Sequence, residues 1–469
     1  MEDLLYQFVG LYKKSPLWVK KIIGTTYGFF PYSFRYGKQY ADYKSLAGSA
    51  RQWSIKDRDE FLLTKLIFLV RHAYETVPFY KKKYDEAGVG PDTLRSLQDF
   101  EKFPCVTRED IKNNRELLLS TAYGEGDRLY TATSGSSGVP LELFHHKGVT
   151  RAKERAFLHD LFEQFGYRPG QKYAVFRGEI IENDTKPWYF DPIDKALILS
   201  SYKLSSGTVQ KYCDIMIKEN IKTIRGYPFM IFKLVQLMEE AGIKAFTLNC
   251  IILESENIYE LHREKIKAFF NCPVCHYYGH TERLGFGGNC LQSEQYFMHP
   301  AYGHTEVLTT EGQVVDIGAQ GEIVTTGFDN LVMPLIRYRT QDFAIKGAEH
   351  RDSGLCYPVL EEVMGREEEF VYLIGGETIP FHNLLAGIHS GVWGLAYKMQ
   401  CVQQNIGELI INIVPEALVD PKKAENAFKE EISRRVPANK LALTAVTVDA
   451  IPVTKSGKTK LFLQKCSAE

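Results

Sequence analysis

Residues 130–140, YTATSGSSGVP, combine hydroxyl side chains and glycines in the way that an anion-binding loop requires. Glycine lets the backbone turn tightly and approach a ligand closely. Successive exposed backbone N–H groups form a concave anion site, to which serine and threonine hydroxyls add donors. The Gly-Lys-Ser/Thr ending of a P-loop is absent, so this is a different kind of phosphate cradle. A flexible Ser/Gly surface loop is the alternative that this stretch alone leaves open.

Three further stretches carry carboxylates, hydroxyls or lysines that could act on phosphate groups. ESE (254–256) and YYGHTE (277–282) each come at the end of an apolar, strand-like run. Ligands of parallel sheets gather at the carboxyl ends of the strands, so both stretches are candidates for one site. The basic, glycine-containing stretch IPVTKSGKTKLF (451–462) is expected in an exposed loop near the end of the chain.

The elements that position these residues follow an α/β order. Between residues 148 and 279 helical and apolar strand-like segments alternate, which predicts a mostly parallel sheet with helices on its faces. From about 300 to 345, short β-like segments separated by glycines suit a small antiparallel barrel or sheet: HTEVLTT, GQVVDIG and GEIVTTG. After the charged stretch GREEEF, a compact α+β module is expected from strands at 396–403 and 408–414, a helix at 421–436 and a strand at 442–448.

Composition excludes several classes of protein. The chain has 469 residues, enough for two or three domains, and is 44% hydrophobic and 25% charged, as soluble globular proteins are. A net charge of −1 provides no field that would recruit nucleic acid. Nine scattered cysteines fit a reducing compartment better than a disulfide framework, and no apolar run approaches a membrane span. A cytoplasmic protein is expected.

The first 45 residues are rich in aromatic and basic side chains. Such a segment could make a peripheral membrane contact. An N-terminal arm packed on its own domain is the commoner explanation.

In order and spacing, five motifs resemble those of the adenylate-forming superfamily. TATSGSSGVPL resembles its phosphate loop, and YYGHTE resembles its aromatic-Gly-x-Thr-Glu motif. The other three are GAQGEIVTTG, RYRTQD and TKSGKTK, the last resembling the catalytic-lysine motif. VPFYKKKYDEAGV and FPCVTREDI point to the phenylacetate–CoA ligase branch, and LSSYKLSS with IRGYP points to the CapK-type proteins associated with capsule polysaccharide.

This resemblance implies an α/β fold in two domains. Residues 1–365 would form a large adenylation domain, with α/β sheets and a small β-barrel, that binds ATP and a small-molecule carboxylate. Residues 366–469 would form a small mobile α+β lid that turns at a hinge near Glu368. The implied reaction converts the carboxylic acid and ATP into an acyl-adenylate and pyrophosphate, and then transfers the acyl group to CoA or another acceptor, a thiol or an amine.

The resemblance also assigns roles to individual residues. Thr281 would contact the α-phosphate, Glu282 would bind Mg²⁺, and Lys458 would be the catalytic lysine that meets the negative charge of the transition state. The β- and γ-phosphates would be bound by the cradle residues Thr133, Ser134, Gly135, Ser136, Ser137 and Gly138.

The adenosine part of ATP would be held by a second group of residues. Tyr278, with Gly279 beside it, would stack on adenine, and the loop of Ser255 and Glu256 would contact its edge. Asp342 would accept hydrogen bonds from the ribose, and Arg366 would support the ribose or phosphate. Gln341 stands where the family usually has glycine. The acid pocket would come from the region of Tyr227, Pro228 and His280, and His145 with His146 either lines that pocket or lies at the surface.

Several alternatives remain open. A structural Zn²⁺ is one, because Cys272, Cys275, His276, Cys290 and His299 have a compatible spacing, although buried single cysteines are common. The acyl group could pass to a carrier protein or an amino sugar, and a nucleotide-binding interaction protein without catalysis is a third hypothesis. A homodimer is an expectation from the phenylacetate–CoA ligase branch.

Overall fold

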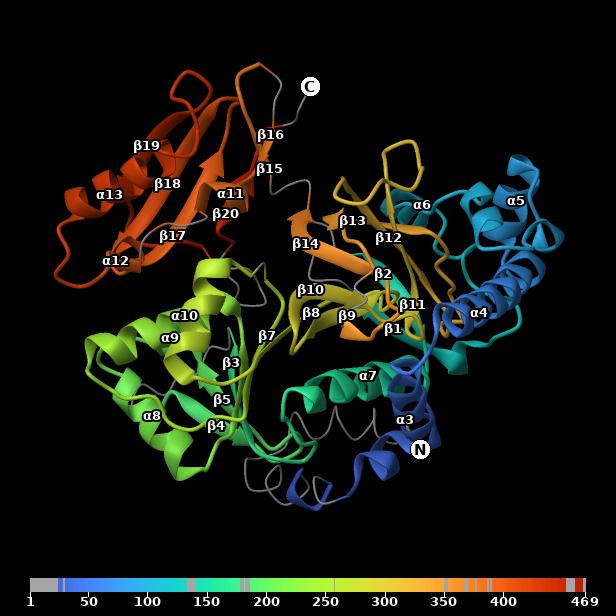
Figure 1. Cartoon of the computed structure of the whole chain (residues 1–469), viewed down its shortest axis with the longest axis horizontal. Helices are drawn as coiled ribbons and strands as arrows, with labels where there is room; N and C mark the ends of the chain where they lie inside the picture. Colours follow the sequence, from blue (N-terminus) through green and yellow to red (C-terminus); the bar gives the residue numbers. More distant parts are fainter. Residues whose placement is uncertain are drawn as a thin grey trace.

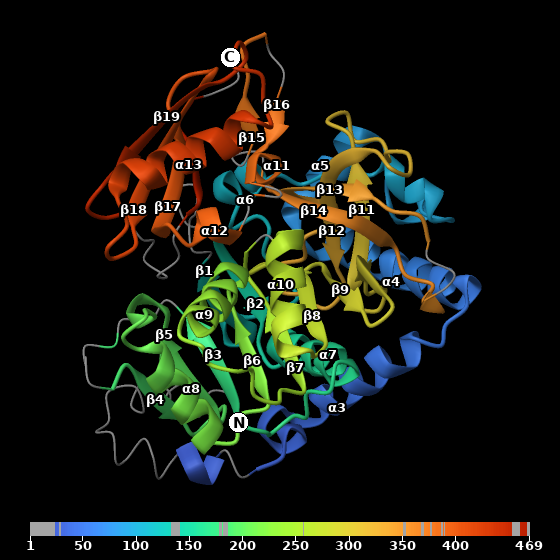
Figure 2. The same cartoon turned by 60° about the vertical axis from the view of Figure 1, so that its left-hand side comes forward.

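The computed structural model describes residues 24–27, 30–132, 141–177, 181, 186–256, 258–349, 353–366, 370–375, 378–385, 388, 390–452 and 460–466. A large sheet flanked by helices makes up most of the molecule, and a smaller C-terminal domain lies over α9 (Pro228–Glu240) and α10 (Glu260–Phe270) (Figures 1 and 2). None of the helices in these parts of the chain is long and apolar enough to cross a lipid bilayer.

The N-terminal helices begin and end where local signals dictate. Ser54 and Thr107 each form a capping box with an aspartate three residues later, at α4 (Ile55–Thr76) and α6 (Arg108–Asn113). Pro78 opens α5 (Pro78–Ala87) because proline fits the first turn of a helix but not its interior. Short 3₁₀ turns lie at Pro91–Thr93, Gln98–Lys102, Glu125–Asp127 and Ser201–Lys203.

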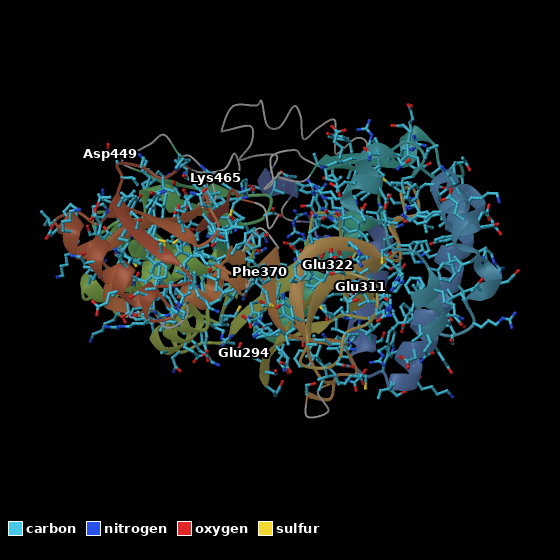
Figure 3. The ribbon with its side chains drawn as sticks, turned by 90° about the horizontal axis from the view of Figure 1, so that it is seen from above. Glu294, Glu311, Glu322, Phe370, Asp449 and Lys465 are labelled. Carbon is cyan, nitrogen blue, oxygen red and sulfur yellow. The ribbon has the colours of Figure 1, made fainter. Side chains whose placement is uncertain are left out.

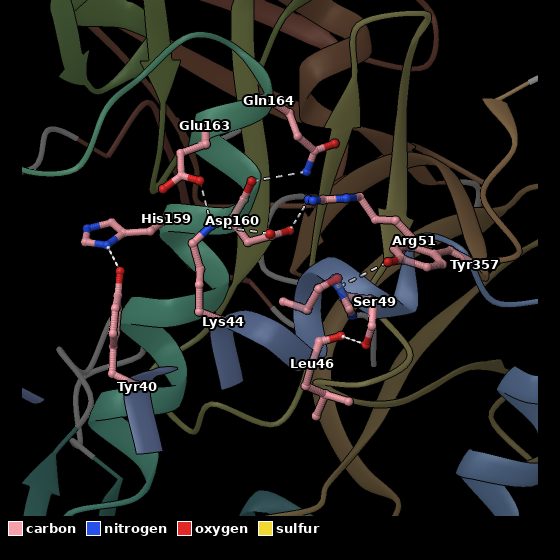
Figure 4. A network of polar contacts seen from close by, with 12 residues as sticks. Tyr40, Lys44, Leu46, Ser49, Arg51, His159, Asp160, Glu163, Gln164 and Tyr357 are labelled. Atoms are coloured by element: carbon pink, nitrogen blue, oxygen red, sulfur yellow. Dashed lines mark hydrogen bonds and ion pairs between the residues drawn. The ribbon is translucent and has the colours of Figure 1, made fainter. Parts of the chain in front are cut away.

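Helix α3 (Tyr32–Ala50) is fastened to α7 (Thr150–Gln164) by polar contacts (Figure 4). The guanidinium of Arg51 and the ammonium of Lys44 both pair with the buried carboxylate of Asp160. The hydroxyl of Tyr40 lies 2.8 Å from Nδ1 of His159. Residues 32–51 therefore form an arm packed on its own domain, which is the commoner of the two explanations for the N-terminal segment. Residues 1–23 lie outside the described residues.

The parallel half of the sheet is the predicted α/β unit. Its strands are β3 (Tyr173–Arg177), β5 (Ala196–Ser200), β6 (Thr223–Gly226), β7 (Cys250–Leu253) and β8 (Val274–Gly279), with β4 (Trp188–Asp191) antiparallel at the edge. One face packs on α8 (Val209–Lys218), α9 and α10, and the other on α7. The alternation of helical and apolar segments thus predicted this layer correctly.

The antiparallel half continues the same sheet through β8. Its strands are β9 (Phe286–Cys290), β10 (Ser293–Met298), β11 (Gly303–Leu308), β12 (Gln320–Gly327), β13 (Tyr338–Lys346) and β14 (Val359–Arg366). The expectation of a strand in GQVVDIG was wrong, because that stretch contributes only an isolated bridge between Val314 and Leu308. A separate hairpin pairs β1 (Arg128–Ala132) with β2 (Glu142–His146).

The C-terminal domain is a four-stranded sheet covered by one helix. Strands β17 (Ala396–Gln403), β18 (Glu408–Pro415), β19 (Ala442–Thr447) and β20 (Phe462–Gln464) stand in the order β19-β18-β17-β20, with α13 (Pro421–Ser433) across them. Asp420 caps α13, and Pro421 begins it at the first residue of the predicted helix. The remaining elements are β15 (Phe370–Tyr372), β16 (Thr378–Pro380), α11 (Phe381–Leu385) and α12 (Ser390–Trp393).

One hydrophobic cluster joins the two domains. Trp393 of the C-terminal domain packs on Phe229 and His262 of the large domain, with ring centroids 5.9 and 5.5 Å apart. The ammonium of Lys233 on α9 pairs with the carboxylate of Glu416 after β18. On the other side of the junction, Phe370 meets Phe343 of β13 edge to face at 5.8 Å; Figure 3 labels Phe370 between the C-terminal domain and the antiparallel strands.

The buried imidazole of His262 makes this junction acid-sensitive. The ring is 1% exposed and stacked on Phe232 at 4.0 Å, and burial lowers its pKa to about 3. Between pH 6.5 and pH 3 the proton therefore binds to His262 only in the unfolded chain. The stabilisation that the neutral ring contributes is fully present above pH 6.5 and is lost as the pH falls through that window. Urea titrations at pH 7.5 and pH 5 give the fall in the free energy of unfolding between the two pH values. This fall should be about 2 kcal/mol smaller in His262→Gln than in the parent chain.

The comparison in that experiment is between variants, since other buried histidines titrate in the same window. The variant is expected to be less stable than the parent at pH 7.5, because it loses aromatic packing. An unchanged difference between the two pH values would show that His262 becomes protonated without cost in the folded chain.

Candidate active site

Three of the predicted adenosine residues meet at the end of β8. The hydroxyl of Tyr278 donates a hydrogen bond of 2.8 Å to Oδ2 of Asp342 on β13. Burial, together with the Asp342 carboxylate, holds the pKa of Tyr278 well above its usual value, so the phenol stays a donor. The backbone of Arg366 pairs with that of Asp342 across β13 and β14. Three residues that are 64 and 24 positions apart in the sequence are thus brought to one place.

Gln341 adopts the backbone conformation that the family's glycine would favour. Its φ is +65°, and its backbone N–H donates to Oε1 of Glu322 at 2.9 Å. The hydroxyl of Thr340 donates to the carbonyl of Ile323 and accepts from the backbone N–H of Asp342 at 3.1 Å. The turn that presents Asp342 is therefore retained, with strain at the residue before it.

Replacing Gln341 with glycine should stabilise the protein. Relief of left-handed strain exceeds the extra entropy of glycine in the unfolded chain, so we expect a gain of about 0.5–1 kcal/mol in the free energy of unfolding. Urea denaturation measures it. Gln341→Ala is the matched control, because alanine loses the same exposed side chain but keeps the strain. A gain of equal size in both variants would contradict the argument.

The carboxylate of Glu282 contacts the side chains of His280 and Tyr338. Nδ1 of His280 lies 3.0 Å from Oε2, and the hydroxyl of Tyr338 donates to Oε1 at 3.3 Å. Glu282 is buried, at 6% exposure, whereas its neighbour Thr281 is exposed. Mg²⁺ is commonly held by one or two carboxylates together with substrate phosphates, so this single carboxylate beside an exposed hydroxyl fits that cation. His280, expected near the acid pocket, contacts Glu282.

His145 connects the hairpin to the Thr281 backbone. Its Nε2 lies 3.0 Å from the carbonyl oxygen of Thr281, and the ring is 2% exposed. Burial, helped by the nearby Arg283 charge, lowers the pKa of His145 to about 4, so the ring is neutral at pH 7. His145 therefore neither lies at the surface nor lines an acid pocket. His146 packs against Tyr123.

The predicted phosphate loop spans the two strands of this hairpin. Ala132 pairs with Glu142, so the ends of the loop are fixed, and β2 carries His145 to Thr281. The cradle residues 133–138 and Lys458 lie outside the described residues. Their roles stay predictions.

A cleft opens between the two domains. Two predicted residues line it: Tyr227, proposed for the acid pocket, and Glu256, proposed for adenine. Ser255 beside it has a φ of +70°, a strained conformation for serine. The C-terminal domain contributes Tyr397, Lys398 and Leu461. Sequence reasoning missed this contribution, since no local pattern in β17 indicates which surface it will face.

A buried charge cluster beneath the site was also missed. The guanidinium of Arg225 on β6 lies 2.6 Å from Oε2 of Glu254, which also accepts from the hydroxyl of Tyr277 at 3.0 Å. This cluster joins the carboxyl ends of β6, β7 and β8 just below the loops that carry the predicted residues. An arginine inside the apolar run IKTIRGYP was the available signal.

The zinc alternative finds no support in the part of the chain that the structure describes, where no three potential ligands gather. Cys272, Cys275 and Cys290 belong to three different hydrophobic clusters. His276 lies 2.9 Å from the carbonyl of Glu294, and His299 lies 3.1 Å from the hydroxyl of Tyr357.

The sequence is similar to those of several known proteins. Residues 381–465 match the family model described as the CapK C-terminal domain. The chain is 22% identical to the phenylacetate-coenzyme A ligase of Thermus thermophilus over 84% of its length and 94% of the relative. It is 23% identical to Protein CapK of Staphylococcus aureus over 78% of its length and 81% of the relative.

Solved structures show the fold. A 2-hydroxyisobutyryl-CoA ligase in the postadenylation state with 2-HIB-AMP superposes with a TM-score of 0.68 and 19% identity, over 87% of this chain and 90% of that one. An open conformation of the same ligase, with 2-HIB-AMP and CoA, has a TM-score of 0.55 and 18% identity over 87% and 92% of the two chains. The resemblance to the adenylate-forming superfamily, and within it to phenylacetate–CoA ligases and CapK-type proteins, is therefore confirmed, and the chain has the adenylate-forming ligase fold.

Proposed function

We propose that the protein uses ATP to activate a carboxylic acid as an acyl-adenylate, with release of pyrophosphate, and then transfers the acyl group to an acceptor, of which CoA is the first candidate. The observation that carries the proposal is the convergence at the end of β8, where Tyr278 meets Asp342 while the carbonyl of Thr281 meets His145 of the hairpin whose strands flank the predicted phosphate loop. The phenylacetate-coenzyme A ligase and the 2-hydroxyisobutyryl-CoA ligase named above use CoA, which supports the same acceptor.

In this proposal each part of ATP has its own binding residues. Asp342 accepts hydrogen bonds from the ribose, and the N–H groups and hydroxyls of 133–138 bind the β- and γ-phosphates. Thr281 donates to the α-phosphate, and Glu282 would hold Mg²⁺. The cation neutralises phosphate charge when it is bound.

Lys458 would complete the site from the C-terminal domain. Leu461 lines the cleft together with Tyr227 and Glu256. Lys458 precedes Leu461 by three residues in the sequence, which supports this role. Its ammonium would stabilise the negative charge that builds up between the carboxylate and the α-phosphate.

We also propose that the division near residue 365 separates the adenylation domain from a lid that changes orientation between the two half-reactions. The higher TM-score to the postadenylation state than to the open state supports an adenylation-type arrangement here. In this arrangement Lys233 pairs with Glu416 across the junction.

The cleft favours an acid with an apolar part. Leu204, Phe229 and Met230 line its large-domain side together with Tyr227. A role in surface-polysaccharide biosynthesis is favoured by the similarity to Protein CapK, and it makes an amino sugar or a carrier protein the second candidate for the acceptor.

Pyrophosphate exchange over a panel of aryl, acyl and amino acids tests the first half-reaction. Exchange with at least one apolar acid is expected, and ATP binding without exchange for any acid would favour a nucleotide-binding protein instead. Product analysis with CoA, a carrier protein and an amino sugar then identifies the acceptor. Rapid thioester formation with free CoA would exclude the sugar and carrier hypotheses.

A further inference from the structure

The imidazole of His280 has a defined orientation. The backbone N–H of Gly285 points at Nε2 from 3.3 Å, so Nε2 is the accepting nitrogen and Nδ1 carries the proton. Nδ1–H then donates to Oε2 of Glu282 at 3.0 Å. The side chain of His280 is only 8% exposed. One carboxylate oxygen of Glu282 is therefore fixed by the ring of His280, and the backbone of Gly285 orients that ring.

Gly285 allows this approach because it has no side chain. A Cβ at that position would lie 2.6 Å from Cγ2 of Thr325, whose hydroxyl is itself 3.5 Å from Nε2 of His280. The backbone of 285, Thr325 and the imidazole are therefore packed together on the side of the ring away from Glu282. This packing leaves the ring little freedom to turn.

We propose that His280 is a positioning residue, which holds the carboxylate of Glu282 in the orientation that binds the divalent cation of the ATP complex. The inference rests on the proposed function. His280 occupies the variable position of the aromatic-Gly-x-Thr-Glu motif, so the motif alone does not require it. Hydrogen-bond partners of a metal ligand affect cation affinity because they fix the ligand and tune its basicity.

Cation binding to the full chain tests the proposal. Mn²⁺ is titrated by electron paramagnetic resonance in the presence of an ATP analogue with a methylene group between the α- and β-phosphates. His280→Leu should weaken Mn²⁺ binding about 10-fold or more. His280→Asn should recover most of the loss, because the amide nitrogen of asparagine replaces Nδ1 as the donor. His146→Leu is the control, since His146 packs against Tyr123 rather than Glu282.

The possible outcomes distinguish a failure of this inference from a failure of the proposed function on which it rests. Unchanged Mn²⁺ affinity in His280→Leu, with a loss in Glu282→Gln, would overturn the inference alone. Equal losses in the leucine and asparagine variants, with lowered thermal stability in both, would also overturn it, because they indicate a purely structural histidine. Unchanged affinity in Glu282→Gln would remove the metal role of Glu282 and the inference with it.

Discussion

Replacing Lys458 with alanine is expected to lower the rate of pyrophosphate exchange by about 10²–10³-fold, because an electrostatic contact to the transition state is lost. The negative charge at the α-phosphate grows as the carboxylate attacks, so the effect belongs to the rate rather than to substrate binding. The KM values for ATP and the acid should therefore change much less than kcat.

Lys455→Ala is the matched control for this experiment. Lys455 lies three residues away in the same basic stretch and carries the same charge, yet it stands outside the Ser-Gly-Lys sequence. Its replacement should leave exchange nearly unchanged. Equal losses in the two variants would indicate a general effect of positive charge and would remove the assignment of Lys458. Acyl transfer from a supplied acyl-adenylate should survive in Lys458→Ala, since the lysine serves only adenylation in the proposed cycle.

Replacing Arg337 with methionine is expected to lower the free energy of unfolding by about 3–5 kcal/mol, the usual cost of removing one partner of a buried ion pair. The guanidinium is 2% exposed and binds both carboxylate oxygens of Glu306, at 3.1 and 2.9 Å. It also donates to the carbonyls of Glu101 and Phe103, at 2.8 and 2.6 Å. Without it, the carboxylate of Glu306 stays buried and loses its counter-ion.

Urea denaturation measures this loss in the free energy of unfolding, and two further variants serve as controls. Arg434→Met removes the arginine that follows α13, whose side chain is 60% exposed, and should change stability by no more than about 0.5 kcal/mol. Arg337→Met combined with Glu306→Leu should be more stable than Arg337→Met alone, because no unpaired charge remains. If the double variant were less stable than the single one, packing rather than charge would explain the cost.

The elements of the fold were predictable because their signals are local. The break at Val77–Pro78, the capping boxes at Ser54 and Thr107, and the apolar strands that became β7 and β8 all depend on neighbouring residues. The stretch GQVVDIG shows where such local signals mislead. It has the composition of a strand, but only one bridge joins it to the sheet, and a strand requires a partner along its length.

In the candidate site, too, some features were predictable from the sequence and others were not. The order of motifs indicated which residue types would serve ATP, and Tyr278 and Asp342 are in contact as that hypothesis requires. The turn that presents Asp342 forms although Gln341 stands where the family usually has glycine, because the glutamine accepts a φ of +65°. No pattern in the chain indicated that His280 would turn toward Glu282, since a neighbouring backbone N–H decides which way the ring faces.

The linear chain determined the strands, the helices and the kinds of side chain that end each strand, because hydrogen bonding and side-chain periodicity act between near neighbours. Packing between distant segments decided the rest. It brought His145 to the carbonyl of Thr281, 136 residues away, and placed Lys233 against Glu416, 183 residues away. The first contact requires packing within the large domain, and the second requires the hydrophobic faces of the two domains to be buried together; both depend on the shape of the whole molecule.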